Sequence, residues 1–153
     1  MANNPNNITV VGNITRDPEM KYTPSGAGQA ILGIAVNRSW KNQQTDTWEE
    51  RVSFFNVVCW KDLADNVSAS LRKGMRVVVI GRLEQRSWET DSGEKRSVVE
   101  IVADEIAPSL LFATADVHRT ERKTGDGGFN SGGKARPSAR SGGYGDPGGE
   151  EPF

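Results

Sequence analysis

The sequence predicts an all-β fold with one helix, followed by a disordered C-terminal tail. Before residue 114, apolar residues recur in short runs with a period of two, which is typical of half-buried strands. One stretch, residues 62–73, instead repeats its apolar residues every four positions, as one face of a helix does. From residue 115 on, glycine, serine, proline and charged residues dominate. Such a segment buries too little apolar surface to offset the entropy lost on ordering it.

Five segments carry the strand pattern and are separated by turn residues. They are residues 8–14, 29–40, 51–60, 75–88 and 96–106. Residues 19–23 are expected to extend the first strand after a bend near Pro18. The turn signals are Thr23-Pro24-Ser25-Gly26, the polar loop 42–47, and Asp91-Ser92-Gly93-Glu94.

The predicted helix lies between the third and fourth strands. Asp62 is expected to cap its N-terminus, and Gly74 is expected to stop its C-terminus. Leu63, Val67 and Leu71 would then share the buried side. Three strands, a helix and two further strands follow the order of an OB-fold, a five-stranded barrel whose surface often binds oligonucleotides.

Composition narrows the classes of function. The formal net charge is −1, so bulk positive charge for binding duplex DNA is absent, although a local basic groove is not excluded. No signal peptide or membrane span is visible, so we expect a cytoplasmic protein. The chain has one cysteine and one histidine, which cannot form a Cys/His metal cluster. We therefore expect no metal, no cofactor and no catalytic residues, and we expect Cys59 to be a buried thiol.

The period-two alternation divides each strand into two sides. In the fourth strand, Met75, Val77, Val79, Gly81 and Leu83 form the expected core side, and the other side carries arginines and Trp88. In the second and third strands, the sides of interest are Leu32, Ile34, Val36, Arg38 and Trp40, and Val52, Phe54, Asn56, Val58 and Trp60.

Aromatic and basic side chains on one surface favour binding of single-stranded nucleic acid. Aromatic rings stack on bases without selecting among them, and cations neutralise phosphates. The stacking candidates are Trp40, Phe54, Trp60 and Trp88. The phosphate-binding candidates are Lys21, Arg38, Lys73, Arg82 and Arg86. Trp48 is a weaker stacking candidate. A tryptophan on a strand more often packs in the core, so the polar neighbours of these rings carry the argument.

Several segments together resemble the bacterial single-stranded DNA-binding proteins, and one of them resembles the actinobacterial branch. They are ITVVGNITRDPEMKYTPSG, AVNRSWK, FNVVCWKDLADNVSASLRKGMRVVVIGRL, RSWETDSGEKR and, for the actinobacterial branch, DEIAPSLLFATADV. The resemblance implies an OB-fold at residues 1–114, a disordered linker at 115–149 and an acidic partner-docking tip at 150–153. It also implies a homotetramer that coats single-stranded DNA in the nucleoid during replication, recombination and repair.

The family's stacking positions fall on the same four aromatic residues, with two departures. Phe54 stands where tryptophan is typical, and Trp60 stands where phenylalanine is typical. The tip, Glu150-Glu151-Pro152-Phe153, would recruit replication, recombination and repair proteins. It carries fewer acidic residues than the family usually shows, which is compatible with a secondary paralogue.

Two other classes of function remain to be weighed. An OB-fold module that binds RNA, or that serves as a primosome accessory, is the first alternative. An enzyme such as a hydrolase is the second, and it would have to use an acidic pair such as Glu49 and Glu50. No catalytic constellation supports an enzyme.

Overall fold

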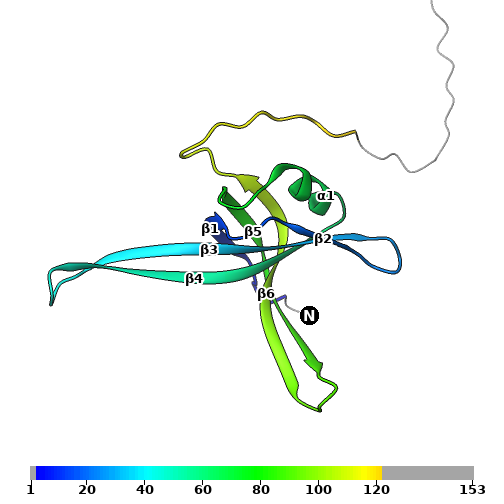
Figure 1. Cartoon of the computed structure of the whole chain (residues 1–153), viewed down its shortest axis with the longest axis horizontal. Coiled ribbons are helices and arrows are strands. Elements are labelled where there is room, and N and C mark those ends of the chain that lie inside the picture. The colour runs from blue at the N-terminus through cyan, green and yellow to red at the C-terminus, as the bar shows by residue number, and fades with distance from the viewer. Residues whose placement is uncertain (1–2, 122–153) are drawn as a thin grey trace, which may run out of the picture. The chain divides into compact units, whose positions relative to one another are not determined.

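The computed structural model describes residues 3–121 of the chain. Within them, residues 3–117 belong to one compact unit. Its elements are β1 (Ile8–Ile14), β2 (Glu19–Tyr22), β3 (Gly28–Asn42), β4 (Thr47–Trp60), α1 (Lys61–Ser70), β5 (Arg76–Glu89) and β6 (Lys95–Pro108). Figure 1 shows them in order along the chain.

The strands close into a barrel. The sheet order is β1-β5-β6-β4-β3-β2, and an additional β1–β3 pairing closes the ring through five of these strands. β2 is added at the edge of β3. All pairings are antiparallel except β4–β6, which is parallel. The predicted OB-fold barrel with one helix between its third and fourth strands is confirmed, and residues 19–22 form a strand of their own after the bend.

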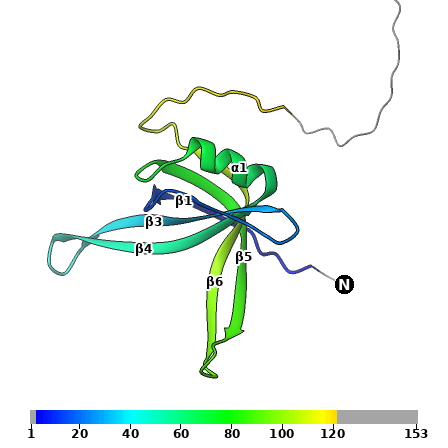
Figure 2. The same cartoon turned by 45° about the vertical axis from the view of Figure 1, so that its right-hand side comes forward.

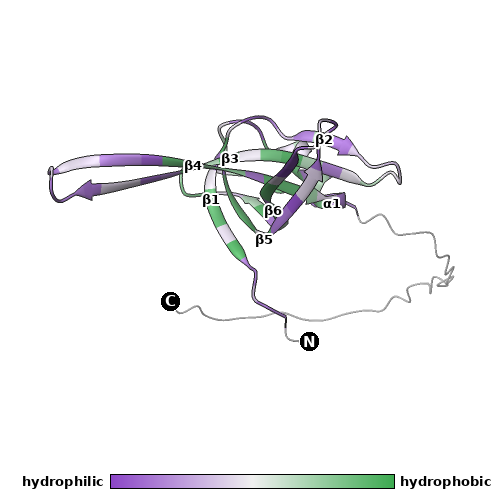
Figure 3. Cartoon of the chain, turned by 90° about the horizontal axis from the view of Figure 1, so that it is seen from below, coloured by the Kyte–Doolittle hydropathy of each residue, from purple (hydrophilic) through white to green (hydrophobic). Residues whose placement is uncertain are grey.

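Two hairpins extend beyond the barrel. The β3–β4 ribbon (residues 35–54) and the β5–β6 ribbon (residues 84–100) leave the barrel in different directions (Figures 1 and 2). The outer part of the β3–β4 ribbon is mainly hydrophilic, whereas apolar residues concentrate where the strands form the barrel (Figure 3). The ribbons therefore offer exposed two-stranded surfaces.

The core is aliphatic. Its buried cluster comprises Val10, Ile14, Ala30, Leu32, Ile34, Val57, Cys59, Ala64, Val67, Leu71, Val77, Val79, Ile101, Ala103 and Ile106. The alternation predicted in β5 holds for Val77, Val79 and Gly81. It fails at Met75 and Leu83, which are exposed because they lie where the strand leaves the barrel.

Both predicted helix ends are wrong. Trp60 occupies the N-cap position with extended backbone and no side-chain cap bond, so Asp62 lies in the first turn. The helix ends at Ser70, and Arg72 donates hydrogen bonds from Nη1 to the carbonyls of Ser68 and Leu71. Gly74, with φ 88°, instead serves the turn into β5.

The chain also pairs over longer strands than predicted, because both ribbons continue to their turns. β4 begins at Thr47 rather than at residue 51, and β6 runs from Lys95 to Pro108. No helix among residues 3–121 is long and apolar enough to cross a membrane.

Barrel closure depends on a glycine in β5. The register between β5 and β6 shifts at Ile80/Gly81, as in a β-bulge. A Cβ at Gly81 would lie 2.2 Å from the carbonyl oxygen of Val102. The backbones therefore approach more closely than any other residue allows.

We predict that Gly81→Ala lowers the free energy of unfolding by about 1–3 kcal/mol, the cost of overpacking a tight interior. Chemical denaturation monitored by tryptophan fluorescence would measure the loss. Gly28→Ala is the matched control, because its added Cβ meets only side-chain atoms, the nearest at 3.3 Å. Equal losses in both variants would contradict the close approach at Gly81.

Candidate nucleic-acid interface

The strand register defines one continuous surface on the side of the sheet away from the core, here called the outer face. Residues directly opposite each other in adjacent strands point to the same side. One row of such neighbours crosses five strands: Glu19, Ile31, Val58, Val102 and Arg82. Val58 and Val102 are buried but belong to no part of the core cluster. The outer face therefore has a small apolar centre of its own.

Three predicted stacking residues lie on this face. Trp60 shares a row with Gln29 and Lys21 near the barrel, and its side chain is 39% exposed. Phe54 projects from the β3–β4 ribbon and is 73% exposed. Trp88 lies near the end of the β5–β6 ribbon and is 41% exposed. The register brings them onto one surface from both ribbons.

Trp48 belongs to the same surface. It lies opposite Lys41 near the turn of the β3–β4 ribbon, on the same side as Phe54, and is 71% exposed. Lys41 is paired with Asp46, Nζ to Oδ1, at 2.6 Å. Trp48 was expected to be a weaker stacking candidate because it follows the predicted loop 42–47. In the structure it lies within β4.

Trp40 lies on the other side of the β3–β4 ribbon, here called the reverse face. Trp40 lies directly opposite Glu49 in the β3–β4 pairing. Phe54 lies directly opposite Ala35, and that pair points to the outer face. The expectation of a single track carrying all four stacking rings is therefore wrong. Trp40 is half-buried, and the guanidinium carbons of Arg38 and Arg51 lie 5.8 and 5.7 Å from its ring centroid.

Arg51 was missed by the sequence analysis. It lies directly opposite Arg38 in the β3–β4 pairing. A signal was present, because a hairpin that turns within residues 43–46 places residue 38 beside residue 51. Strand alternation alone does not show this, since it sorts the sides of one strand at a time.

The predicted phosphate-binding residues differ in their partners. Arg82 lies 3.6 Å from Glu84 and 3.5 Å from Asp104, and Arg86 lies 3.6 Å from Glu100. Lys21 lies 3.7 Å from Glu19. The pairs of Lys21 and Arg82 join exposed side chains and contribute little free energy, so a phosphate group can replace the carboxylate there. In the Arg86 pair, the Glu100 side chain is only 16% exposed.

Arg38 and Lys73 have no carboxylate within 4.0 Å among residues 3–121. Lys73 follows α1 in the turn where its backbone N–H donates to Asp17 at 2.8 Å. It is not part of the strand rows of either face. The register therefore groups Lys21, Arg82 and Arg86 on the outer face, Arg38 on the reverse face, and leaves Lys73 apart.

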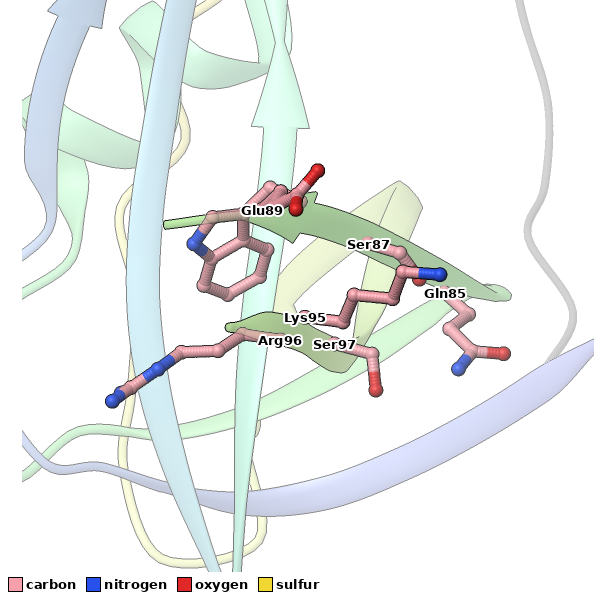
Figure 4. A pocket seen from close by; sticks show the side chains of 7 residues that line it. Gln85, Ser87, Glu89, Lys95, Arg96 and Ser97 are labelled. Carbon is pink, nitrogen blue, oxygen red and sulfur yellow. The ribbon is translucent and has the colours of Figure 1, made fainter. Parts of the chain in front are cut away.

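A shallow hollow of about 410 Å³ lies at the end of the β5–β6 ribbon. Its lining residues are Gln85, Ser87, Trp88, Glu89, Lys95, Arg96 and Ser97. Figure 4 shows Lys95 and Arg96 extending in different directions from this end of the ribbon. Arg86 stacks its guanidinium 4.9 Å from the centroid of the Trp88 ring. This end of the ribbon thus combines an aromatic ring with several cations.

The remaining predictions concern the partner-docking tip, the thiol of Cys59 and a metal site. The tip residues Glu150, Glu151, Pro152 and Phe153 lie outside the described residues. Cys59 is buried, and its Sγ donates to the Ala30 carbonyl at 3.8 Å. Burial raises the pKa of this thiol to about 11, which keeps it protonated and unreactive near neutral pH. Within residues 3–121, no group of three metal-ligating side chains lies close together.

Comparisons with known proteins agree with this geometry. The model of the single-strand binding protein family matches residues 5–109. A protein of Corynebacterium glutamicum named single-stranded DNA-binding protein is 56% identical over 123 residues, which cover 80% of this chain and 55% of that protein. A Mycobacterium tuberculosis protein of the same name is 46% identical over 140 residues, covering 91% of this chain and 84% of that protein.

A solved structure described as Plasmodium falciparum SSB complex with ssDNA has the same fold. Its TM-score is 0.66 at 24% sequence identity, and the match covers 71% of this chain and 98% of that one. At this identity, the likeness concerns the fold alone. The aligned part of the present chain spans only about half of the Corynebacterium relative, 55% of its length.

We predict that Cys59 contributes stability that is lost at alkaline pH. The pKa of this thiol is 9.0 in the unfolded chain and about 11 in the folded chain, where it is buried. Below pH 9 both states hold the proton. Between pH 9 and 11 only the unfolded state releases it, which costs the folded state about 1.4 kcal/mol per pH unit. Denaturation midpoints across this range, compared with those of Cys59→Ala, measure the difference, and parallel pH profiles would contradict it.

Proposed function

Since this chain belongs to the single-strand binding protein family, we propose that its outer face binds single-stranded DNA without sequence preference. The observation that carries the proposal is the register itself, which gathers Phe54, Trp60 and Trp88 with basic side chains on one exposed surface. Stacking supplies affinity for any base, and the cations supply affinity for the backbone.

The wider role follows from binding of this kind. We propose that the chain coats and protects single-stranded DNA during replication, recombination and repair, as a non-enzymatic protein located with the nucleoid. The tip, Glu150-Glu151-Pro152-Phe153, would recruit partner proteins through its acidic pair and terminal aromatic ring. A pull-down from cell lysate that compares the full chain with a tip-deleted chain tests this part of the proposal.

Assembly as a homotetramer is proposed on separate grounds. Leu110, Leu111, Phe112 and Val117 follow β6, and all are highly exposed in the single chain. Apolar side chains grouped in this way are typical of surfaces that a partner covers. Light scattering on the full chain gives the mass of the assembly directly, and a monomeric mass would exclude this part of the proposal.

The central experiment is a titration of intrinsic tryptophan fluorescence with oligothymidine. Because three of the chain's four tryptophans, Trp48, Trp60 and Trp88, lie on the outer face, stacking bases should quench the emission. Affinity should fall as salt rises, by counterion release. An unchanged signal with no binding at low salt would exclude the proposal, and a clear preference for a matched RNA strand would favour the RNA-binding alternative.

We predict that replacing Trp60 or Trp88 on the outer face weakens DNA binding. Trp60→Ala and Trp88→Ala should each cost about 1–3 kcal/mol, the contribution of one stacked base. Tyr22→Ala is the control, because this exposed ring lies on the opposite side of β2 from Lys21 and so lies off the outer face. Wild-type affinity in both tryptophan variants would remove them from the binding surface.

We predict that Glu100→Gln strengthens binding at low salt. Glu100 lies 3.6 Å from Arg86 and occupies the outer face opposite Glu84, so its charge both holds the arginine and repels phosphate. The gain should be severalfold and should disappear at high salt because charge interactions are screened. Glu105→Gln removes the same charge from a site outside these ion pairs and should change affinity less. Identical effects of the two substitutions would show that only net charge matters.

A further inference from the structure

The reverse face of the β3–β4 ribbon carries an unusual pair of charges. Arg38 and Arg51 are direct cross-strand neighbours, and both are exposed. Like charges in directly opposite positions destabilise a sheet. An anion that lies between two cations removes this repulsion. The guanidinium carbons of both arginines also lie within 5.8 Å of the Trp40 ring centroid, so one ring contacts two cations.

The chain does not supply the missing anion from the described residues. Glu49 is the carboxylate on this side of the ribbon, next to Trp40 in register. Its Oε1 accepts a hydrogen bond from Asn42 Nδ2 at 2.6 Å. Among residues 3–121, neither arginine has a carboxylate within 4.0 Å. The arginines of the outer face, by contrast, are paired with acids.

We propose that Arg38 and Arg51 together bind one phosphodiester group of single-stranded DNA, with Trp40 orienting both guanidinium groups. The inference rests on the proposed function and adds Arg51 to the residues that contact the backbone. Guanidinium forks match phosphate oxygens in geometry, and two adjacent forks offer more donors than one phosphate needs. A phosphate between them also removes the repulsion between Arg38 and Arg51.

The location of this site has a consequence for the path of the DNA. Phe54 and Trp48 lie on the outer face of the same ribbon, and the arginine pair lies on its reverse face. A strand that contacts both must pass around the edge of a two-stranded ribbon. Short oligonucleotides, at the lower end of the roughly 4–16 nucleotides that one OB-fold covers, should occupy the outer face alone. Longer ones should reach the arginine pair.

The salt dependence of binding tests the site in the full chain. Each lost phosphate contact lowers the slope of log affinity against log salt by about 0.7 for single strands. With a long oligothymidine, the Arg38→Gln/Arg51→Gln variant should lower the slope by about 0.7, because the two arginines share one phosphate, and Arg51→Gln alone should lower it by part of that amount. Arg51→Lys should restore most of the slope, since it keeps the charge. With the shortest oligonucleotides that bind, Arg51→Gln should have little effect.

Arg72→Gln is the matched control. It removes the same charge from a guanidinium that donates to helix carbonyls away from the ribbon, and it should leave the slope unchanged. Thermal melting of each variant verifies that it folds. A second arm uses Glu150→Gln/Glu151→Gln in the full chain. If Arg51→Gln changes the slope only when these tip residues are intact, the site binds the chain's own acidic tip and the phosphate assignment is wrong.

The outcomes separate this inference from the proposed function. A wild-type chain that binds no DNA refutes the proposed function itself. Normal binding with an unchanged slope in Arg51→Gln refutes the arginine site and leaves the function standing. An equal effect on short and long oligonucleotides would contradict the two-face arrangement.

Discussion

The proposed binding surface depends on the short parallel pairing between β4 and β6. Only two pairs form it, Val57 with Ile101 and Val58 with Val102. The first pair points into the core and the second lies on the outer face. This pairing joins the two ribbons within the barrel and places their outer sides on one surface. A slip of one residue would turn every side chain of one ribbon to the other side. Burial of both pairs therefore fixes the register on which the proposed interface depends.

Strand alternation predicted the barrel but not the sides of the ribbons. The segments around residues 8–14, 29–40 and 51–60 were recognisable because half-buried strands alternate. Trp40 and Phe54 could not be assigned to opposite faces in this way, because that requires the register across the hairpin. The helix start was misplaced for another physical reason. Asp62 matches the residue preference of an N-cap, but the N-cap position is Trp60, whose backbone is extended, so the helix begins earlier.

Local pairing of charges matters more here than net charge. A formal charge of −1 gave no sign of an anionic ligand. On the outer face, Arg82 and Arg86 hold carboxylates at 3.5–3.6 Å, so the proposed binding of DNA would exchange one anion for another there. On the reverse face, the arginine pair has no acid to release among the residues that the structure describes. The two faces should therefore differ in how much each gains from a phosphate, although their sequences carry similar residues.

The exchange of Phe54 and Trp60 relative to the usual family pattern has a structural reading. Trp60 lies opposite Gln29 of β3 and two residues beyond Val58, which pairs with β6, and it is 39% exposed. Phe54 lies on a two-stranded ribbon and is 73% exposed. Ordering a mobile group on binding costs free energy, and a supported ring has already lost part of its freedom. Tryptophan, the larger ring, therefore occupies the position at which binding has to order the side chain less. Because both rings offer a flat π surface, the exchange redistributes stacking between barrel and ribbon without making the interface selective for a base.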